Sequence, residues 1–388
     1  MKVKIYLFPL LFLFSLFSFS QTVSQDTSAT RNQQRNAAQN ILNGTISKGI
    51  TVGGYAEVDY NQPEGKNGEL DVHRLVLLFG YRFSDRVQFV TEIEYEHVKE
   101  LYIEQAFLNY NLNPDHSIRG GLMLVPMGIV NEYHEPTTFN GVERPNVDKS
   151  IIPTTWREIG IGMTGKFDEA SVRYQAYIFN GFASVEGDKF LGGPNAFRNG
   201  RQKGAESIIN TPNFSTKIDY YGLPGLRLGA SFYTGRSQAT DEAQQFDGSD
   251  VGLNMFGLDM RYLNRRFSAR GQYIHALIND AEAYNQLYET DLGSELRGWY
   301  LEMGYNLLSP VKEQRLDAFV RYEDYDTHAA VEEAGISRNP FYHRKEWTLG
   351  VSYHVARGAV VKGDYQFLDN AGDSGSTGQL NFGFGIWF

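Results

Sequence analysis

The sequence contains no cysteine in its 388 residues, which excludes disulfides, thiol chemistry and cysteine-ligated zinc or iron–sulfur centres. The net charge of -10 argues against a nucleic-acid partner. After the first 20 residues no apolar run approaches the length of about 18 residues that a membrane-spanning helix needs. The chain is instead rich in aromatic residues and glycine, with 24 Tyr, 26 Phe and 40 Gly. This composition favours many twisted strands with aromatic girdles.

The N-terminal stretch "MKVKIYLFPLLFLFSLFSFSQ" has the layout of a secretory signal peptide. Lys2 and Lys4 precede an apolar segment at 5–19, and Ser18 and Ser20 are small residues suited to cleavage before the next residue. We predict a cleaved signal peptide at 1–20; the alternative is a retained anchor. Residues 21–48 are polar and predict a disordered or weakly helical periplasmic leader.

From Gly49 onward the hydrophobic pattern has a period of two, which indicates β-strands. Most of the candidate strands have about ten to twelve residues, enough for a tilted strand to cross a membrane. The pattern predicts sixteen strands, at 49–60, 70–83, 87–98, 101–112, 117–126, 157–167, 170–180, 213–222, 225–236, 250–262, 266–278, 295–307, 315–326, 346–355, 358–368 and 377–388.

The connections between these strands alternate in length. Those after even-numbered strands are short, such as "SDR" at 84–86 and "ARG" at 356–358. Those after odd-numbered strands are mostly long, such as 127–156 and 181–212; the short link near Val98 is the exception. Alternating short turns and long loops with an even strand count are typical of outer-membrane barrels. The fold class predicted is therefore all-β: a transmembrane, antiparallel, up-and-down barrel at 49–388.

The two faces of the strands differ in polarity. In "EWTLGVSYHV", Trp347, Leu349 and Val351 share one face, while Glu346 and Thr348 share the other. Lipid tolerates only the apolar face, because a charge in mid-bilayer costs roughly 2–4 kcal/mol. A sheet in lipid must also close, since it can leave no open edge. A barrel of about sixteen strands is wide enough to enclose an aqueous channel.

The chain ends on "GQLNFGFGIWF", a strand with one apolar face that runs to the last residue. We expect this last strand to pair with the first and close the barrel. Outer-membrane barrels in general end on an aromatic residue, and this end resembles the signal read by the barrel-assembly machinery. Phe388 is therefore predicted to be an assembly signal rather than a pore residue.

Residues 101–165 resemble the phosphate-selective porin O and P family of Bacteroidetes-type Gram-negative bacteria. The segments that carry the resemblance are "GLMLVPMG", "HEPTTFNGVERP" and "IIPTTWREIGIG", with weaker echoes at 319–328 and 360–370. The resemblance implies a porin of the outer membrane with sixteen strands and a homotrimeric assembly. It also implies that the long loop after strand five folds into the barrel.

Phosphate-selective members of that family line their channels with an excess of Arg and Lys. A lumen that concentrates phosphate should have a clear positive excess, whereas here the two signs nearly balance. The strand pattern places the following charged residues inward: Arg74, Arg82, Arg119, Lys166, Arg173, Lys217, Arg227, Arg261, Arg270, Arg321 and Lys362, with Glu92, Glu94, Glu96, Glu158, Asp219, Asp259, Asp317, Glu323, Glu346 and Asp364.

The loop at 127–156 is the candidate constriction. Our hypothesis is that its charges face the opening opposite arginines of the wall, so that a transverse field orients solutes and filters ions by sign. The alternative is that these charges cap turns or pair with one another at the rim. The residues assigned to this constriction are Glu132, His134, Glu135 and Arg144 from the loop and Arg119 and Arg173 from the wall.

Three further motifs predict no chemistry. "EYHEP" at 132–136 has one His between carboxylates but no helix or second His to complete a metal site. "GIGMTG" at 160–165 matches the dinucleotide fingerprint in letters but lies inside a strand. "DNAGDSGS" at 369–376 lacks the spaced ligands of a calcium loop. We therefore predict no catalytic residues, no cofactor and no metal.

The function predicted is passive diffusion of small hydrophilic solutes or ions through a water-filled porin channel, with phosphate and other anions among the candidates. The expected partners are outer-membrane lipids, the barrel-assembly machinery and the solutes. The alternative is a structural or adhesion barrel acting through long loops such as 181–212 and 327–345. An outer-membrane enzyme is a third alternative, against which no catalytic triad is recognisable.

Overall fold

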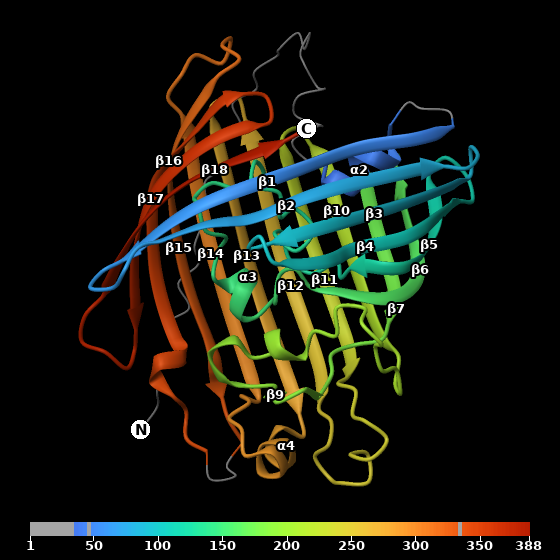
Figure 1. The fold of residues 1–388 in the computed structure, drawn as a ribbon, viewed down its shortest axis with the longest axis vertical. Helices are drawn as coiled ribbons and strands as arrows, with labels where there is room; N and C mark the ends of the chain where they lie inside the picture. The colour runs from blue at the N-terminus through green and yellow to red at the C-terminus, as the bar shows by residue number, and fades with distance from the viewer. Residues whose placement is uncertain (1–34, 45–47, 333–335) are drawn as a thin grey trace, which may run out of the picture.

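The computed structural model describes residues 35–44, 48–332 and 336–388 as a closed antiparallel barrel of sixteen strands (Figure 1). The signal peptide predicted at 1–20 and the leader residues 21–34 lie outside the described residues. The described chain also contains a two-stranded sheet, β8 (Val185–Glu186) with β9 (Lys189–Phe190). Short helices are α2 (Ala37–Leu42), α3 (Val147–Ser150), α4 (Ala281–Tyr288), η1 (Gly193–Asn195), η2 (Arg198–Gly200) and η3 (Pro340–Tyr342).

Each barrel strand pairs with its neighbour in the chain, so the topology is up-and-down, as predicted. The barrel strands are β1 (Gly49–Pro63), β2 (Glu69–Arg82), β3 (Val87–Glu96), β4 (Glu100–Asn111), β5 (His116–Leu124), β6 (Arg157–Phe167), β7 (Val172–Phe179), β10 (Asn213–Leu223), β11 (Leu226–Arg236), β12 (Gly252–Asn264), β13 (Phe267–Asn279), β14 (Glu295–Asn306), β15 (Arg315–Ala330), β16 (His343–Ala356), β17 (Ala359–Asn370) and β18 (Thr377–Trp387).

The sixteen predicted strands are confirmed, with ends shifted by a few residues. The largest difference is at β15, which continues to Ala330; β16 also differs, because it begins at His343. Both strands extend because the ladder continues there, with Ala330 opposite Glu295 and His343 opposite Asp326.

The last strand closes the barrel against the first. β18 pairs with β1 over nine residues, from Tyr55 opposite Trp387 to Pro63 opposite Gln379. The backbone N–H of Phe388 donates to the carbonyl of Gly54 at 2.9 Å, and the N–H of Gly54 donates to the carbonyl of Phe388 at 3.0 Å. A Cβ atom at Gly54 would lie 2.8 Å from the Phe388 ring, so glycine leaves the room that this terminal ring occupies.

The outer surface of the barrel is apolar, as the strand pattern predicts. On β16, Trp347, Leu349 and Val351 are about half exposed, while the alternate residues Thr348 and Ser352 are buried inside. Among the described residues, none of the helices is long and apolar enough to cross a membrane. A closed barrel with an apolar outer band belongs in the outer membrane of a Gram-negative bacterium. The long loops then face the outside of the cell and the short turns face the periplasm.

The loop between β5 and β6, here called L3 (residues 125–156), lies inside the barrel and carries α3 (Figure 1). Its apolar residues Val125, Met127, Ile129 and Val147 are completely buried. The predicted inward-folding loop is therefore confirmed. The interior is less open than a hollow sixteen-stranded barrel would be, because L3 packs against the wall with an apolar core of its own.

Helix α2 also lies against the inner wall, at the periplasmic end. It contacts β1, β2 and β3, and its residues Ala37 and Ala38 are buried. Arg82 on β2 donates to the Leu42 carbonyl at 3.3 Å. Residues 37–42 thus form a short helix within the barrel, where the sequence predicted only a disordered or weakly helical leader. Its small apolar face, completed by Ile41, provides the burial that the polar composition did not predict.

Replacing Leu349 with Arg tests which face of β16 meets lipid. Leu349 lies in mid-strand with an exposed fraction of 46%, so we expect the substitution to lower the free energy of unfolding by about 2–4 kcal/mol. Urea unfolding of the protein refolded in lipid vesicles measures this. Val355→Arg, near the periplasmic turn, is the matched control and should cost about 0–1 kcal/mol. Equal costs at the two positions would contradict the depth assigned to Leu349.

Deleting Phe388 tests the assembly role predicted for the last residue. The deletion removes both backbone hydrogen bonds with Gly54, so the edge of β1 loses its last partners. We expect a several-fold lower yield of folded barrel in the outer membrane, read from the heat-modifiable band on a gel. Phe388→Tyr keeps the ring and the backbone and should assemble normally. Normal assembly of the deletion would show that Phe388 is dispensable.

Candidate functional site: L3 and the charged lumen

Charged and polar side chains of the wall hold the backbone of L3. Asp364 accepts from the Val142 N–H at 2.6 Å, and Glu323 accepts from the Val147 N–H at 3.1 Å. Gln272 accepts from the Ile129 N–H at 2.6 Å. Hydrogen bonds to a buried charged group are stronger than neutral ones, so these contacts fix the position of the loop. The loop is thereby part of the lining of the lumen.

Each of the charged residues that the strand pattern assigned inward is buried or half-buried, which confirms the parity of the wall. Most of them are paired with a charge of opposite sign. The pairs include Arg74 with Glu57 at 2.7 Å, Arg227 with Asp219 at 2.6 Å, Arg270 with Glu302 at 2.7 Å and Arg321 with Glu323 at 2.9 Å. The wall is therefore close to neutral where these pairs lie.

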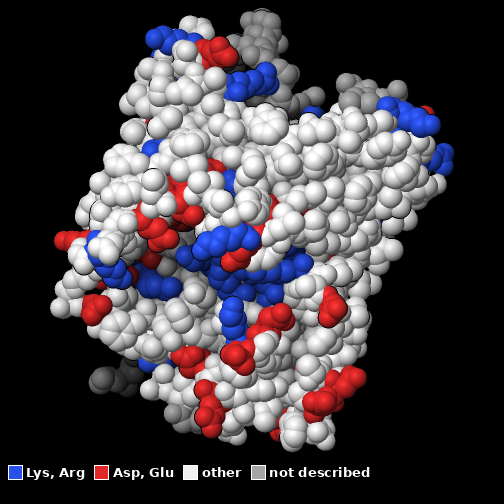
Figure 2. Space-filling view, viewed as in Figure 1, with Lys and Arg blue, Asp and Glu red and all other residues white. Residues whose placement is uncertain are grey.

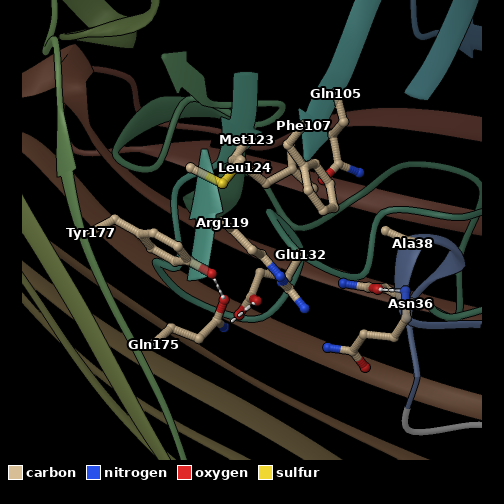
Figure 3. A pocket seen from close by; sticks show the side chains of 11 residues that line it. Asn36, Ala38, Gln105, Phe107, Arg119, Met123, Leu124, Glu132, Gln175 and Tyr177 are labelled. Carbon is tan, nitrogen blue, oxygen red and sulfur yellow. Dashed lines mark hydrogen bonds between the residues drawn. The ribbon is translucent and has the colours of Figure 1, made fainter. Parts of the chain in front are cut away.

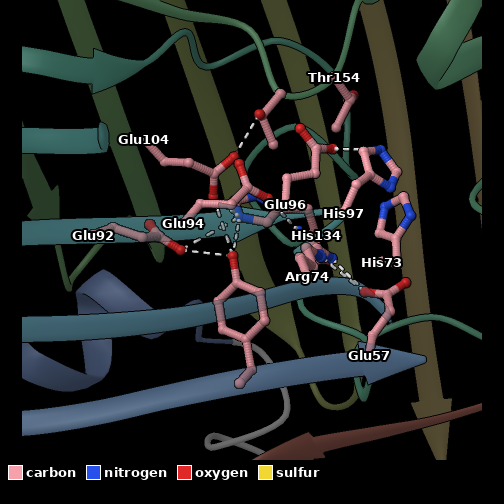
Figure 4. Close-up of polar contacts among 12 residues, drawn as sticks. Glu57, His73, Arg74, Glu92, Glu94, Glu96, His97, Glu104, His134 and Thr154 are labelled. Atoms are coloured by element: carbon pink, nitrogen blue, oxygen red, sulfur yellow. Dashed lines mark hydrogen bonds and ion pairs between the residues drawn. The ribbon is translucent and has the colours of Figure 1, made fainter. Parts of the chain in front are cut away.

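A buried cluster surrounds His134 (Figure 4). The His134 Nε2 atom lies 3.3 Å from Glu104 and 3.6 Å from Glu92. The Tyr55 hydroxyl lies 2.9 Å from the same nitrogen and donates to Glu92 at 2.7 Å. Burial lowers the pKa of His134, but the charge of Glu104 and its hydrogen bond outweigh burial and raise the pKa to about 10. His134 is therefore an imidazolium that neutralises one of two buried carboxylates.

Two of the predicted constriction residues come together. Arg119 on β5 and Glu132 on L3 line one pocket together with Gln175 (Figure 3). Glu132 accepts from Gln175 at 2.6 Å and lies 3.2 Å from the Lys217 ammonium. Arg119 donates to Asn109 at 2.9 Å. Residues Asn36, Ala38 and Gln39 at the start of α2 also line this pocket.

The other predicted constriction residues lie elsewhere. The Glu135 carboxylate accepts from the Ala37 N–H and so faces α2. Burial raises the pKa of Glu135. Arg173 lies over the Tyr221 ring, 5.3 Å from its centroid. Arg144 lies among the charges of β1 and β2, within electrostatic reach of Glu57. Of the six residues assigned to the constriction, Arg119 and Glu132 are the two that line this pocket together. A transverse field between them, and any role of that field in selectivity, stays a hypothesis.

The loop between β7 and β10, here called L4 (residues 180–212), brings a basic cluster to L3. We define this basic cluster as Arg144, Arg157, Arg198, Arg201 and Lys203. Arg198 donates to the Thr154 carbonyl at 2.8 Å, and Arg201 donates to the Pro153 and Thr155 carbonyls at 3.1 and 3.2 Å. In Figure 2, Lys and Arg side chains gather near the middle of the face turned to the viewer, below the place where Figure 1 labels β2.

The members of the basic cluster repel one another. Burial, together with the neighbouring charges of Arg198 and Arg157, lowers the pKa of Arg201 to about 9. Burial also lowers the pKa of Lys203, again with Arg201 and Arg157 as the next causes. Such repulsion is relieved when an anion binds between the cations.

Sequence reasoning missed most of this cluster. It did not single out "RNGRQKG" at 198–204, although this run has three cations and no acid in a chain with an excess of acids. It also missed Glu104, because a β-bulge opposite Glu92 and Ile93 turns both Glu104 and Gln105 inward. The glycines of "GIGMTG" lie inside β6, as predicted; a Cβ at Gly162 would lie 2.6 Å from the Tyr177 ring.

No family model matches the chain. It is 35% identical over 342 residues to an uncharacterized protein of Aquifex aeolicus, covering 82% of this chain and 76% of that protein. Its structure is similar to an anion-selective porin from Comamonas acidovorans, with a TM-score of 0.56 and 12% identity over 88% of this chain and 100% of the other. The trimer form of OmpT, an outer membrane protein of Vibrio cholerae, gives the same four values. At these identities the two structures share the barrel fold with this chain.

Replacing His134 with Gln tests the raised pKa. In protein carrying ¹⁵N-labelled histidine, we expect one imidazole signal to stay protonated up to about pH 9, and this signal should be absent from the variant. Because the folded pKa lies above the unfolded value of about 6.5, the stabilisation is complete below that pH and is lost as the pH rises toward 10. A signal assigned to His134 that titrates near pH 6.5 would contradict the ion pairing described above.

Proposed function

The chain belongs to the same family as the Aquifex aeolicus protein and has the fold of the outer-membrane porins, and on this premise we propose that it forms a water-filled channel that favours anions. Small hydrophilic solutes would diffuse through it down their gradients. The proposal states that the channel prefers anions to cations. The wall residues alone left this preference open, because their positive and negative charges nearly balance.

The observation that carries the proposal is the basic cluster. The ionic groups of the wall are mostly paired, whereas no carboxylate of the described chain forms a salt bridge with Arg144, Arg198, Arg201 or Lys203. Paired charges cancel at a distance, so the unpaired cations set the potential at the channel mouth. The cluster is partly buried, which strengthens that potential because less water screens it.

Inorganic phosphate and similar oxyanions are the solutes that this cluster fits best. Arg198 and Arg201 each donate a hydrogen bond from one guanidinium nitrogen to a carbonyl of L3. These hydrogen bonds orient the other N–H groups of each guanidinium. Guanidinium groups bind phosphate oxygens through paired, charge-assisted hydrogen bonds. The resemblance of residues 101–165 to phosphate-selective porins agrees with this choice.

The proposal includes the assembly of the protein. We propose that residues 1–20 are removed as a signal peptide and that Phe388 serves the barrel-assembly machinery. A homotrimer in outer-membrane lipid is proposed from the porin resemblance, and the similarity to the trimer form of OmpT agrees with it.

A structural or adhesion barrel is the second candidate, and one observation favours it. Both L3 and α2 lie inside the lumen, so they narrow any path for solutes. A barrel filled in this way could act through its outer loops instead. The two candidates differ in one property, which is conductance.

The decisive experiment compares the wild type with a variant carrying Arg198→Gln, Arg201→Gln and Lys203→Gln. Single channels in a planar bilayer under a salt gradient should show an anion-favouring reversal potential for the wild type. We expect the anion-to-cation permeability ratio to fall about two- to ten-fold in the variant, because three cations leave the mouth. Phosphate should also reduce the chloride current through the wild type more strongly than through the variant.

The matched control removes three exposed cations outside the basic cluster, Lys66, Lys312 and Arg357, by the same change to Gln. This control should keep the wild-type ratio, and a heat-modifiable gel band confirms that every variant is folded. An equal drop in the control would assign the effect to net charge. Folded wild-type protein without conductance would overturn the channel and favour the structural candidate.

A further inference from the structure

We propose that Asp71, His73 and His97 form a binding site for a divalent transition-metal ion, such as Zn²⁺, at the extracellular mouth of the barrel. Asp71 and His73 lie on β2 near its extracellular end, and His97 lies in the turn between β3 and β4. Figure 4 shows the two imidazole rings next to each other, near Glu57 and Arg74. This site is separate from the channel function proposed above and does not depend on it.

The donor atoms have the chemistry and spacing of a metal site. The Asp71 Oδ2 atom lies 2.6 Å from His97 Nδ1 and 3.7 Å from His73 Nδ1. One donor atom from each of the three residues lies within 4.8 Å of the other two. Two imidazoles and one carboxylate, with a position left for water, are the ligands of many zinc sites. Tetrahedral ligands of Zn²⁺ lie roughly 3.3 Å apart, so small side-chain rotations would complete the site.

A β-bulge in β2 brings His73 to the inner face. Glu57 and Asp59 on β1 are two residues apart, but their partners Arg74 and Asp71 are three apart, so β2 carries one extra residue. Before the bulge Leu70 faces outward with an exposed fraction of 75%, and Asp71 and His73 are half-buried. Without the extra residue, His73 and Arg74 would lie on opposite faces. Bulges of this kind re-aim side chains beside functional sites.

The turn that carries His97 holds an unfavourable backbone conformation. His97 and Val98 have φ angles of 52° and 57°, in the left-handed region that β-branched residues avoid. The His97 N–H donates to the His73 carbonyl at 3.1 Å, and the two rings meet edge to face at 5.4 Å between centroids. Asn-Gly would form this two-residue turn without strain. Backbone strain of this kind is typical of functional sites, and here it places His97 beside Asp71 and His73.

The surrounding charges suit a cation. Asp59 Oδ2 lies 4.0 Å from His73 Nδ1, and Glu96 Oε1 lies 3.9 Å from the Nε2 atom of His97. Glu96 lies on the His97 nitrogen that does not face Asp71, and a carboxylate in that place orients a metal-bound imidazole and strengthens its donor atom. Of the nearby cations, Arg74 is neutralised by Glu57 at 2.7 Å. The positive charge of Arg144 also reaches His73, and the negative charge of Glu143 counters it.

The second cluster of ligand-type residues in the described chain, Glu92, Glu104 and His134, differs in access. Its side chains are at most 2% exposed, and Arg157 lies 3.8 Å from Glu104. His134 already serves as the cation of that cluster. In the proposed site the side chains of His97, His73 and Asp71 are 43%, 31% and 26% exposed. A metal ion can therefore reach the proposed site from the extracellular solution.

Titration of Zn²⁺ into the untagged full chain, refolded in detergent and followed by calorimetry, tests the proposal. We expect one Zn²⁺ per chain, and a roughly ten-fold or greater loss of affinity in His73→Asn and in His97→Asn. Two matched controls, His275→Asn and His134→Gln, should bind like the wild type. His275 is also half-exposed near the extracellular rim and lies 3.0 Å from a single carboxylate.

Three results would overturn the site. They are the absence of saturable Zn²⁺ binding, wild-type affinity in each of the single variants His73→Asn and His97→Asn, and binding that is lost only in His134→Gln. Each variant is first shown to be folded by its heat-modifiable band. Electron paramagnetic resonance of wild-type protein with one equivalent of Cu²⁺ gives a test without variants, since two imidazole nitrogens should split the signal. None of these measurements needs a conducting channel, so their outcome is independent of the channel proposal.

Discussion

A membrane offers no water to backbone N–H and C=O groups, and this constraint shapes the whole protein. All sixteen strands have partners on both sides because β18, at the end of the chain, returns to β1. The last hydrogen bonds of this seam join Phe388 to Gly54. Every other feature, including the inward charges, the loop inside the barrel and the mouth with its histidines, depends on this closed wall.

Closure separates the interior from lipid, so charged side chains can lie there. These charges fall into two groups. Most ionic groups of the wall are paired or hold L3, as Asp364 and Glu323 do through the N–H groups of Val142 and Val147. These groups stabilise the lining. The cations that L3 and L4 contribute to the basic cluster form no salt bridge within the described residues, and on the proposed function they set the field that a passing solute meets. On that proposal, the charges that stabilise the lining differ from those that select the solute.

The sequence predicted the wall well and the interior less well. Period-two alternation and the lengths of the connections identify all sixteen strands, because each strand must cross the same thickness of lipid with the same alternation. The contacts of L3 and L4 follow from long-range packing, which no local pattern encodes. Arg198 and Arg201 were missed for this reason, and the docking of Ala37 beside Glu135 was missed as well. Glu104 and His73 were missed because bulges interrupt the alternation.

Those bulges matter beyond the two side chains they redirect. In β4 the outward residues are Leu101 and Ile103 before the bulge and Leu108 and Tyr110 after it, so the parity of the strand reverses at Glu104. Deleting Glu104 would restore a regular ladder and leave Leu101, Ile103, Leu108 and Tyr110 facing outward, so the strand would lose only the carboxylate that lies beside His134. In a relative of this chain, a gap at Glu104 would therefore mark the loss of the ion pair with His134 inside an otherwise unchanged wall.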